Sequence, residues 1–203
     1  MSKIKVCGLT NLEDAKQAAE VGADLLGFIF AKSPRQVTNR EVAKISKELP
    51  AGVKKVGVFA NQSKAEIKET ITKCDLDYIQ LHGSESPKFC KQFRLPVIKA
   101  FRVKDKTSLS QLREYEVDKY LLDTYVPDKL GGTGKTFNWE LAIQAKKYGS
   151  IIMAGGLEAS NVKLAVKKVS PWAVDVSSGV EVKPGKKDYE QVKEFVESVE
   201  STG

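Results

Sequence analysis

The sequence is poor in the residues that build metal and disulfide sites. It contains one histidine and three cysteines among 203 residues. Cys7, Cys74 and Cys90 lack the paired spacing of a zinc site or a disulfide framework. We therefore expect no metal site and a reducing, cytoplasmic compartment. Cys74 and Cys90 fall in predicted helices, where packing is their expected role.

Long apolar runs are also absent. No stretch approaches the ~20 apolar residues of a membrane span, and the charged N-terminus MSKIKVCGLT does not have the pattern of a signal peptide. The hydrophobic fraction of 41% and the charged fraction of 29% are typical of a globular protein. The length favours a single domain over residues 1–203. The missing apolar span predicts that the protein has no membrane partner. A monomer and a homodimer are both open.

The charge of the chain is not arranged as in a nucleic-acid-binding protein. The net charge is +7, but the lysines are spread along the sequence without an arginine-rich tract. A diffuse basic surface of this kind is either an ordinary solvated exterior or a modest field that attracts small anions. We therefore expect no nucleic-acid partner.

A complete phosphate-binding P-loop is missing as well. The stretch LGGTGKT, residues 130–136, ends like a P-loop, but the pattern requires a further glycine where Lys129 stands. The preceding strand-like segment, DKYLLDT, has a carboxylate, Asp123, next to its last residue, and a P-loop does not need a carboxylate there. The glycine-rich segment therefore needs another explanation.

What the sequence does contain is an alternation of short β-branched runs and amphipathic stretches. Such alternation predicts an α/β protein with a parallel sheet, and eight units predict a closed (β/α)8 TIM barrel. An open doubly wound sheet is the alternative, but the first turn, CGLTN, lacks the glycine fingerprint of that fold. The predicted strands are residues 4–7, 23–30, 53–59, 76–82, 96–103, 118–124, 150–155 and 173–179, and the predicted helices are 11–22, 39–49, 63–74, 86–93, 107–115, 138–149, 158–169 and 188–200.

In a TIM barrel, catalytic residues lie at the carboxyl ends of the strands. Small residues after the last two strands let backbone N–H groups approach a phosphate, although such loops also serve as plain turns. The residues selected by this rule are Cys7, Arg35, Phe59, Ala60, Asn61, His82, Arg102, Asp123, Gly155, Gly156, Ser177, Ser178 and Gly179.

Four of these candidates each have two alternative roles. Cys7 is either a small buried residue or, if nearby positive charge lowers its pKa, a thiolate base or nucleophile. Asp123 is a loop carboxylate or the complementary acid. His82 has a structural role or contacts the substrate, and Arg35 is a surface charge or a fork for a substrate carboxylate.

Seven motifs together resemble the phosphoribosylanthranilate isomerase family of tryptophan biosynthesis. They occur in order along essentially the whole chain. The motifs are KVCGLT, GFIFAKSPRQV, VGVFAN, IQLHG, LLDT with GGTGKTFNW, AGGL and DVSSGVE.

The resemblance implies a reaction and roles for the residues. Family members convert N-(5-phosphoribosyl)anthranilate into 1-(2-carboxyphenylamino)-1-deoxyribulose 5-phosphate by an Amadori rearrangement. It implies that Asp123 protonates the ribose ring oxygen and Cys7 removes the proton at C2. No metal or organic cofactor is implied, because the iminium intermediate is itself the electron sink. It further implies a phosphorylated small-molecule substrate, and a lid at residues 127–137 in which Lys135 adds positive potential.

Two other kinds of protein remain as alternatives. A sugar-phosphate epimerase or the barrel isomerase of histidine synthesis would share the phosphate loops. The histidine-pathway enzyme uses two aspartates, so a cysteine at position 7 disfavours it, and a single histidine disfavours a metal-dependent epimerase. The second alternative is a non-catalytic barrel that binds anions or RNA.

Overall fold

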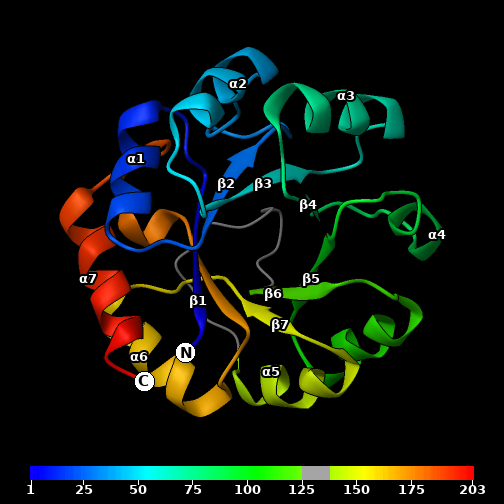
Figure 1. Cartoon of the computed structure of the whole chain (residues 1–203). Coiled ribbons are helices and arrows are strands. Elements are labelled where there is room, and N and C mark those ends of the chain that lie inside the picture. Colours follow the sequence, from blue (N-terminus) through cyan, green and yellow to red (C-terminus); the bar gives the residue numbers. More distant parts are fainter. Residues whose placement is uncertain (125–137) are drawn as a thin grey trace.

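The computed structural model describes residues 1–124 and 138–203, and in it eight parallel strands form a closed barrel (Figure 1). Each strand pairs with the next in the sequence, and β1 pairs with β8. This closure confirms the predicted (β/α)8 barrel and excludes the open sheet. The strands are β1 (Lys3–Cys7), β2 (Leu25–Ile29), β3 (Lys54–Phe59), β4 (Tyr78–Leu81), β5 (Val97–Val103), β6 (Lys119–Thr124), β7 (Ile151–Met153) and β8 (Ala173–Val176). The predicted lid at 127–137, with Lys135, lies outside the described residues.

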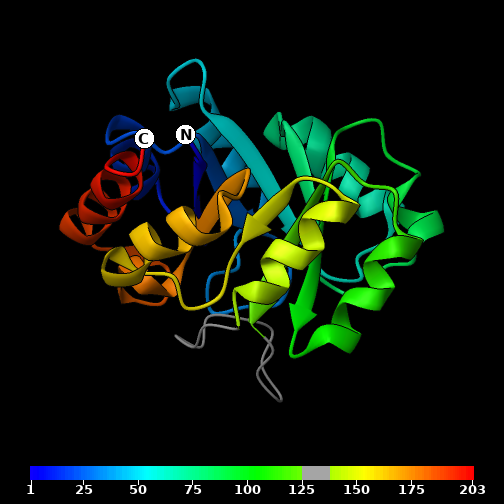
Figure 2. The same ribbon diagram turned by 90° about the horizontal axis from the view of Figure 1, so that it is seen from below.

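Helices cover the outside of the barrel (Figures 1 and 2). Several begin at polar residues that cap them: Asn11 accepts a hydrogen bond from Asp14 N, and Thr38 and Ser63 each form a capping box. The α-helices are α1 (Leu12–Glu20), α2 (Asn39–Glu48), α3 (Lys64–Cys74), α4 (Pro87–Cys90), α5 (Glu140–Ala145), α6 (Ala159–Val169) and α7 (Tyr189–Glu200). The 3-10 helices are η1 (Lys106–Glu114), η2 (Lys146–Tyr148) and η3 (Ser178–Val180).

Four segments differ from the sequence prediction. The helix expected at 86–93 is the single turn α4, the one expected at 107–115 is the 3-10 helix η1, and the one expected at 138–149 is divided into α5 and η2. After β8 the chain forms an unpredicted hairpin, β9 (Glu181–Lys183) with β10 (Lys186–Lys187), which turns at Gly185 with φ +84°. Two short strands separated by two residues have too little periodicity to be read from sequence. This hairpin brings two charged residues to the site described below.

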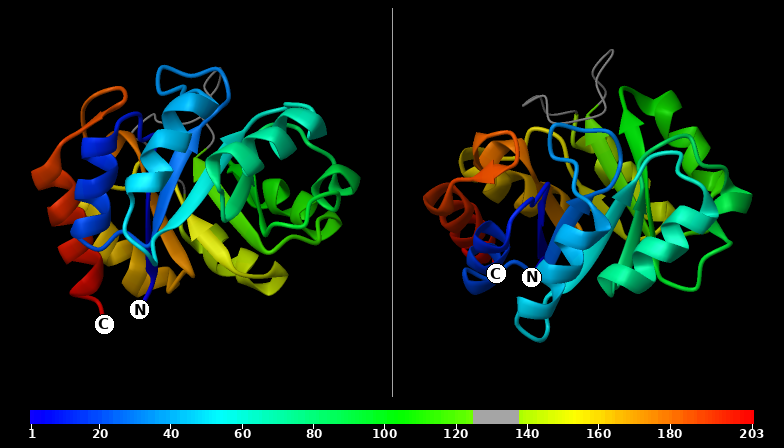
Figure 3. Two further views of the ribbon diagram at one scale, coloured as in Figure 1. Left: turned by 45° about the horizontal axis from the view of Figure 1, so that its top comes forward. Right: turned by 90° about the horizontal axis from the view of Figure 1, so that it is seen from above.

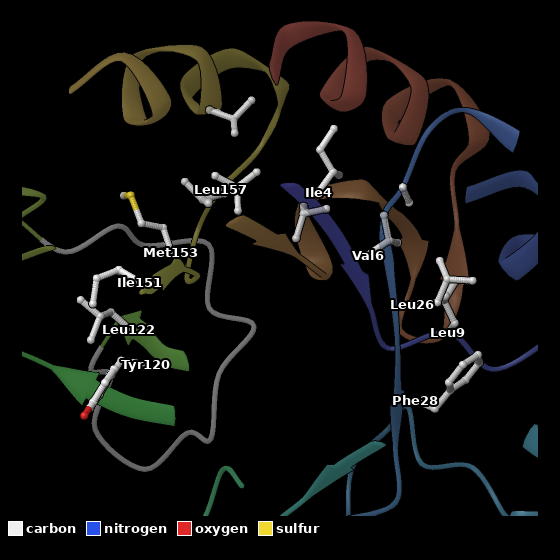
Figure 4. Packing of buried hydrophobic residues seen from close by; sticks show 14 of the residues in the cluster. Ile4, Val6, Leu9, Leu26, Phe28, Tyr120, Leu122, Ile151, Met153 and Leu157 are labelled. Atoms are coloured by element: carbon white, nitrogen blue, oxygen red, sulfur yellow. The ribbon is translucent and has the colours of Figure 1, made fainter. Parts of the chain in front are cut away.

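The apolar core has two parts, one on each side of the strands. Ile4 and Val6 of β1 and Leu26 and Phe28 of β2 belong to the outer cluster between strands and helices (Figure 4). A second cluster, which includes Leu25, fills the interior of the barrel. Its members come from alternate residues of the strands, because every second side chain of a strand points inward. Its other members are Val56, Ile98, Ala100, Leu121, Ile152, Ala154 and Ala173.

The two ends of the barrel are distinct. The N- and C-termini lie together at the end where the strands begin (Figure 3). The strands end at the opposite rim, and the loops that follow them are therefore free to form a site. Among the described residues, no helix combines the length and the apolarity needed to cross a bilayer.

Candidate active site

A cavity of about 510 Å³ lies at the carboxyl ends of the strands. It brings together side chains from β1, β4 and β6 with the loops that follow β2, β7 and β8. Most of the residues selected from the sequence line it. They are Cys7, Arg35, Ala60, His82, Asp123, Gly155, Gly156, Ser177, Ser178 and Gly179. Asn61 and Arg102 line a second cavity instead, and Phe59 is a core residue that stacks on Phe30.

A second cavity of about 660 Å³ lies over β5 and η1. It shares His82 with the first cavity, but neither Cys7 nor Asp123 is among the described residues that line it. The smaller cavity is the one that brings together the thiol of Cys7, the carboxyl group of Asp123 and the imidazole of His82, and convergence of acid and base groups is a sign of a reaction site. The smaller cavity is therefore the candidate active site.

Cys7 is the last residue of β1 and is 5% exposed. Its register partner on β2 is Gly27, where a β carbon would lie 2.7 Å from Cys7 Sγ and 3.1 Å from Lys5 Nζ. Glycine at this position therefore leaves room for the thiol and the ammonium to lie beside each other.

The protonation of Cys7 differs from the expectation that a thiolate is favoured. Burial raises the pKa of the thiol above its ordinary value, and Lys5 and Lys187 act in the opposite direction. Burial wins because the thiol is almost fully removed from water. In the free protein the thiol is therefore the favoured form, and the two ammonium groups set how readily it ionises.

Lys5 and Asp175 form an ion pair inside the barrel. Lys5 Nζ donates to Asp175 Oδ1 at 2.8 Å, and the lysine side chain is 0% exposed. Burial by itself lowers the pKa of Lys5, but Asp175 and Cys7 outweigh burial and the net pKa is raised. The ammonium form is therefore retained next to the thiol.

Asp123 stands near the end of β6, across the barrel from β1, and is 5% exposed. Its Oδ1 accepts a hydrogen bond from Thr124 N at 2.8 Å. Its Oδ2 lies 3.4 Å from His82 Nε2. The carboxyl group is thus held by its own backbone on one side and faces an imidazole on the other.

His82 follows β4 and contacts a buried amide. Gln80 Nε2 lies 3.0 Å from His82 Nδ1, and Gln80 is 1% exposed. Among the described residues, neither Gln80 Oε1 nor His82 Nε2 has a hydrogen-bond partner. His82 Nε2 thus faces the Asp123 carboxyl group at 3.4 Å without a hydrogen bond, and a ligand in the cavity can supply that bond.

Arg35 is not a free surface charge. Its Nε donates to Glu181 Oε1 at 2.8 Å and its Nη2 donates to Glu181 Oε2 at 2.6 Å. Lys187 Nζ also donates to Glu181, at 2.8 Å. Hydrogen bonding to Glu181 raises the pKa of Arg35, while burial lowers the pKa of Lys187. Two cations thus share one carboxylate at the rim of the cavity.

The backbone conformation directly after β1 lets Arg35 reach this position. Gly8 has φ +78°, and a β carbon there would lie 2.6 Å from Arg35 Cδ and 3.0 Å from Ser177 Oγ. Only glycine allows this close approach. Arg35 therefore packs directly over the residue that follows Cys7.

The loops after β7 and β8 form a compact wall of small residues. Gly155 and Gly156 have φ of +81° and +69°. A β carbon on Gly179 would lie 2.2 Å from the carbonyl oxygen of Leu157, so the two loops touch through backbone. This arrangement exposes backbone to the cavity, as the prediction of a phosphate site requires.

Sequence reasoning missed five polar residues around the cavity. Lys5 and Asp175 belong to otherwise apolar strands and face the barrel interior. The sequence signal that could have revealed them is a charged residue within an apolar strand, two residues before a predicted site residue. The others are Gln80, Glu181 and Lys187.

The described residues contain no group of histidine, cysteine and carboxylate side chains arranged to hold a metal ion. The titratable groups that line the cavity are instead the thiol of Cys7, two carboxyl groups, the imidazole of His82 and two cations; the carboxyl groups are Asp123 and Asp175, and the cations are Lys32 and Arg35. This set is suited to acid–base chemistry on an anionic molecule.

The comparisons with known proteins agree with one another. Residues 4–198 match the family model of N-(5'-phosphoribosyl)anthranilate (PRA) isomerase. An N-(5'-phosphoribosyl)anthranilate isomerase of Geobacter sulfurreducens is 52% identical over 97% of this chain and 97% of its own length. A crystal structure of phosphoribosyl anthranilate isomerase in complex with reduced 1-(o-carboxyphenylamino)-1-deoxyribulose 5-phosphate has a TM-score of 0.89 at 38% identity, covering 99% of this chain and 100% of its own.

A further crystal structure, of monomers generated from the dimeric phosphoribosylanthranilate isomerase of Thermotoga maritima, has a TM-score of 0.88 at 38% identity. It covers 99% of this chain and 100% of its own. Sequence and structure therefore match over nearly the full length of both partners. The chain belongs to the N-(5'-phosphoribosyl)anthranilate isomerase family.

Proposed function

We propose that this chain converts N-(5-phosphoribosyl)anthranilate into 1-(2-carboxyphenylamino)-1-deoxyribulose 5-phosphate, with Asp123 as general acid and Cys7 as general base. The observation that carries the proposal is that a thiol from β1 and a carboxyl group from β6 line one cavity, next to two loops of small residues. An aldose–ketose rearrangement needs one group that gives a proton and another that removes one.

The reaction divides between these two groups. Asp123 gives its proton to the ribose ring oxygen, and the C1–O bond breaks as the nitrogen lone pair forms the iminium. The Cys7 thiolate then takes the proton from C2, and the C2–H electrons move toward the iminium to give the enolamine. Tautomerisation to the ketone completes the rearrangement. Because the iminium accepts the electrons, the sequence of steps needs no metal or organic cofactor.

The surroundings of Cys7 support its role as base. Lys5 and Lys187 favour the thiolate, whereas burial favours the thiol. A base with a raised pKa is scarce at neutral pH but removes a proton more effectively once it is ionised. The cavity thus contains a strong base whose population depends on the neighbouring cations.

Arg35 is the proposed partner of the anthranilate carboxylate. Glu181 occupies its Nε and Nη2, so Nη1 takes no part in that pair. Arg35 and Lys187 together carry one more positive charge than Glu181 neutralises. This excess favours a second carboxylate, and the pair with Glu181 fixes the guanidinium plane that would receive it.

The phosphate is assigned to the two loops of small residues. Gly155 and Gly156 follow β7, and Ser177, Ser178 and Gly179 follow β8. In TIM barrels this is a frequent place for a phosphate site. His82, whose Nε2 faces Asp123, is the proposed contact to the sugar part of the substrate.

We also infer the wider setting of the protein. Residues 1–203 are taken as one domain because the barrel closes through β1 and β8. A cytoplasmic location is consistent with three unpaired cysteines. The partner is a phosphorylated small molecule, and a relative that is described as dimeric supports a homodimer as well as a monomer. No membrane or nucleic-acid partner is proposed.

Loss of the substrate's fluorescence during turnover tests the proposal. The purified protein should consume N-(5-phosphoribosyl)anthranilate without added metal, also in the presence of a chelator. It should not turn over the aminoaldose substrate of the histidine-pathway isomerase or a ketose phosphate offered for epimerisation. Turnover of either of those substrates in place of the anthranilate, or anion binding without any turnover, would overturn the assignment.

A further inference from the structure

Lys5 is a buried cation with fewer partners than its charge requires. An ammonium group has three donors, and burial without partners is costly. Lys5 Nζ donates to Asp175 Oδ1, and the side chain of Cys7 is its other hydrogen-bonding partner. The other buried lysine on a barrel strand, Lys99, donates to Leu81 O, Gly83 O and Glu85 Oε2. Lys99 thus has three oxygen acceptors, whereas Lys5 has one oxygen acceptor and the sulfur of Cys7.

The position of Lys5 on β1 places its side chain beside Cys7. Lys5 and Cys7 are two residues apart on β1, so both side chains face the barrel interior. Their side-chain ends also converge, since Cys7 Sγ and Lys5 Nζ lie 2.7 Å and 3.1 Å from the point that a β carbon on Gly27 would occupy. Ionisation of Cys7 therefore turns the weak acceptor beside Lys5 into a charged one.

We propose that Lys5 is a positioning residue that stabilises the Cys7 thiolate, and that the Asp175 carboxylate limits this stabilisation by sharing the same ammonium group. The inference rests on the proposed role of Cys7 as base. When the thiolate takes the substrate proton, Lys5 keeps its own proton and its bond to Asp175. The ion pair therefore persists through the reaction while the thiolate forms and disappears.

The other charges around Cys7 fit this division. Lys5 on β1 and Lys187 on β10 favour the thiolate, and Asp175 on β8 opposes it. Arg35, which follows β2, is a third cation whose own pKa is raised in part by Cys7. Asp123 and His82 line the same cavity from β6 and β4. Among these groups, Lys5 and Asp175 are an ion pair whose two charges act on the thiol with opposite signs.

The test is the alkylation of Cys7 by iodoacetamide as a function of pH, followed by mass spectrometry of the peptide that contains Cys7. Only the thiolate reacts, so the rate reports its population. Lys5→Met should slow alkylation at neutral pH by about tenfold or more, because an opposite charge this close shifts a pKa by about one to three units. Asp175→Asn should speed it up. The pH dependence of kcat/KM should move in the same two directions.

Lys99→Met is the matched control. It also removes a buried, paired lysine from a barrel strand, but its partner Glu85 is not among the residues around Cys7. It should destabilise the fold and leave the alkylation profile of Cys7 unchanged. If Lys5→Met does not fold, the double variant Lys5→Met/Asp175→Asn removes the pair without leaving a buried charge, and its alkylation midpoint should still lie above that of the wild type.

Two outcomes overturn the inference: an unchanged alkylation midpoint when Lys5 is replaced, or an equal shift in Lys99→Met. Both are distinct from a failure of the proposed function. If Cys7 is not the base, Cys7→Ser retains turnover, whereas the alkylation measurement still reports whether Lys5 stabilises the thiolate.

Discussion

Replacing Gly155 by alanine should damage the general acid without touching its carboxyl group. Gly155 has φ +81°, and a β carbon there would lie 2.5 Å from Thr124 N and 2.6 Å from Asp123 Oδ1. Both are atoms of the hydrogen bond that holds the carboxyl group. Alanine therefore forces either Asp123 or the β7 loop to move.

The expected magnitude has two parts. The left-handed backbone conformation costs a residue with a β carbon about 1–2 kcal/mol of folding free energy. Displacement of a catalytic group by about 1 Å costs on the order of 100-fold in rate. Gly155→Ala should therefore lose more than about 2 kcal/mol in the free energy of unfolding and about 100-fold in kcat. KM should rise as well, because the same loop is the proposed phosphate site.

Gly52→Ala separates the two parts. Gly52 has φ +104°, and within the described residues a β carbon there would meet no atom within 4 Å. This variant should lose about 1–2 kcal/mol and keep its kcat. Urea unfolding measures the first quantity and steady-state loss of substrate fluorescence measures the second. A folded Gly155→Ala with both the kcat and the KM of the wild type would refute the placement of the acid and the phosphate on either side of Gly155.

Three further predictions concern single side chains. Asp123→Asn should bind substrate with normal affinity and lose about 10²–10⁴-fold in kcat, as expected for loss of a general acid, and activity within threefold of the wild type would remove Asp123 from the mechanism. Arg35→Met should mainly raise KM, by the equivalent of about 2–5 kcal/mol for a desolvated charge pair, and an unchanged KM would show that Arg35 does not contact the substrate carboxylate. Burial raises the pKa of Glu181, but hydrogen bonds from Arg35 and Lys187 outweigh it and the net pKa is lowered. The ionised Glu181 carboxylate therefore stabilises the folded state above about pH 4.3, and this stabilisation is lost as the pH falls through the folded-state pKa. Acid unfolding of Glu181→Gln should lack this part of the pH dependence, and identical slopes in the two proteins would contradict it.

Much of the fold and the site could be predicted because their information is local. The alternation of strands and helices is a property of neighbouring residues. Once the strands are known, the rule that the site lies at their carboxyl ends selects Cys7, Asp123 and the loops around Gly155 and Ser177. All of these line one cavity. The closure of β1 onto β8 follows from the number of units rather than from any single segment.

The remainder depends on contacts between distant segments. Lys5 and Asp175 lie 170 residues apart, and only their shared register on β1 and β8 makes them a pair. Glu181 and Lys187 reach Arg35 through a hairpin too short to have a periodic pattern. The burial that raises the pKa of Cys7 is likewise a property of the whole barrel, so the sequence indicated the thiol but not its protonation state.

Turnover by Cys7→Ser is the most direct test of the central claim that the Cys7 thiolate is the base. The alcohol has a pKa several units above that of a thiol, which starts near ~8.5, and it cannot remove a carbon-bound proton at neutral pH. The variant should fold, bind the product like the wild type and show almost no loss of substrate fluorescence. Mass spectrometry of the wild type quenched during turnover should show no covalent adduct on Cys7, because a base leaves none. Full activity of Cys7→Ser, or a wild-type adduct of the substrate mass, would contradict the account.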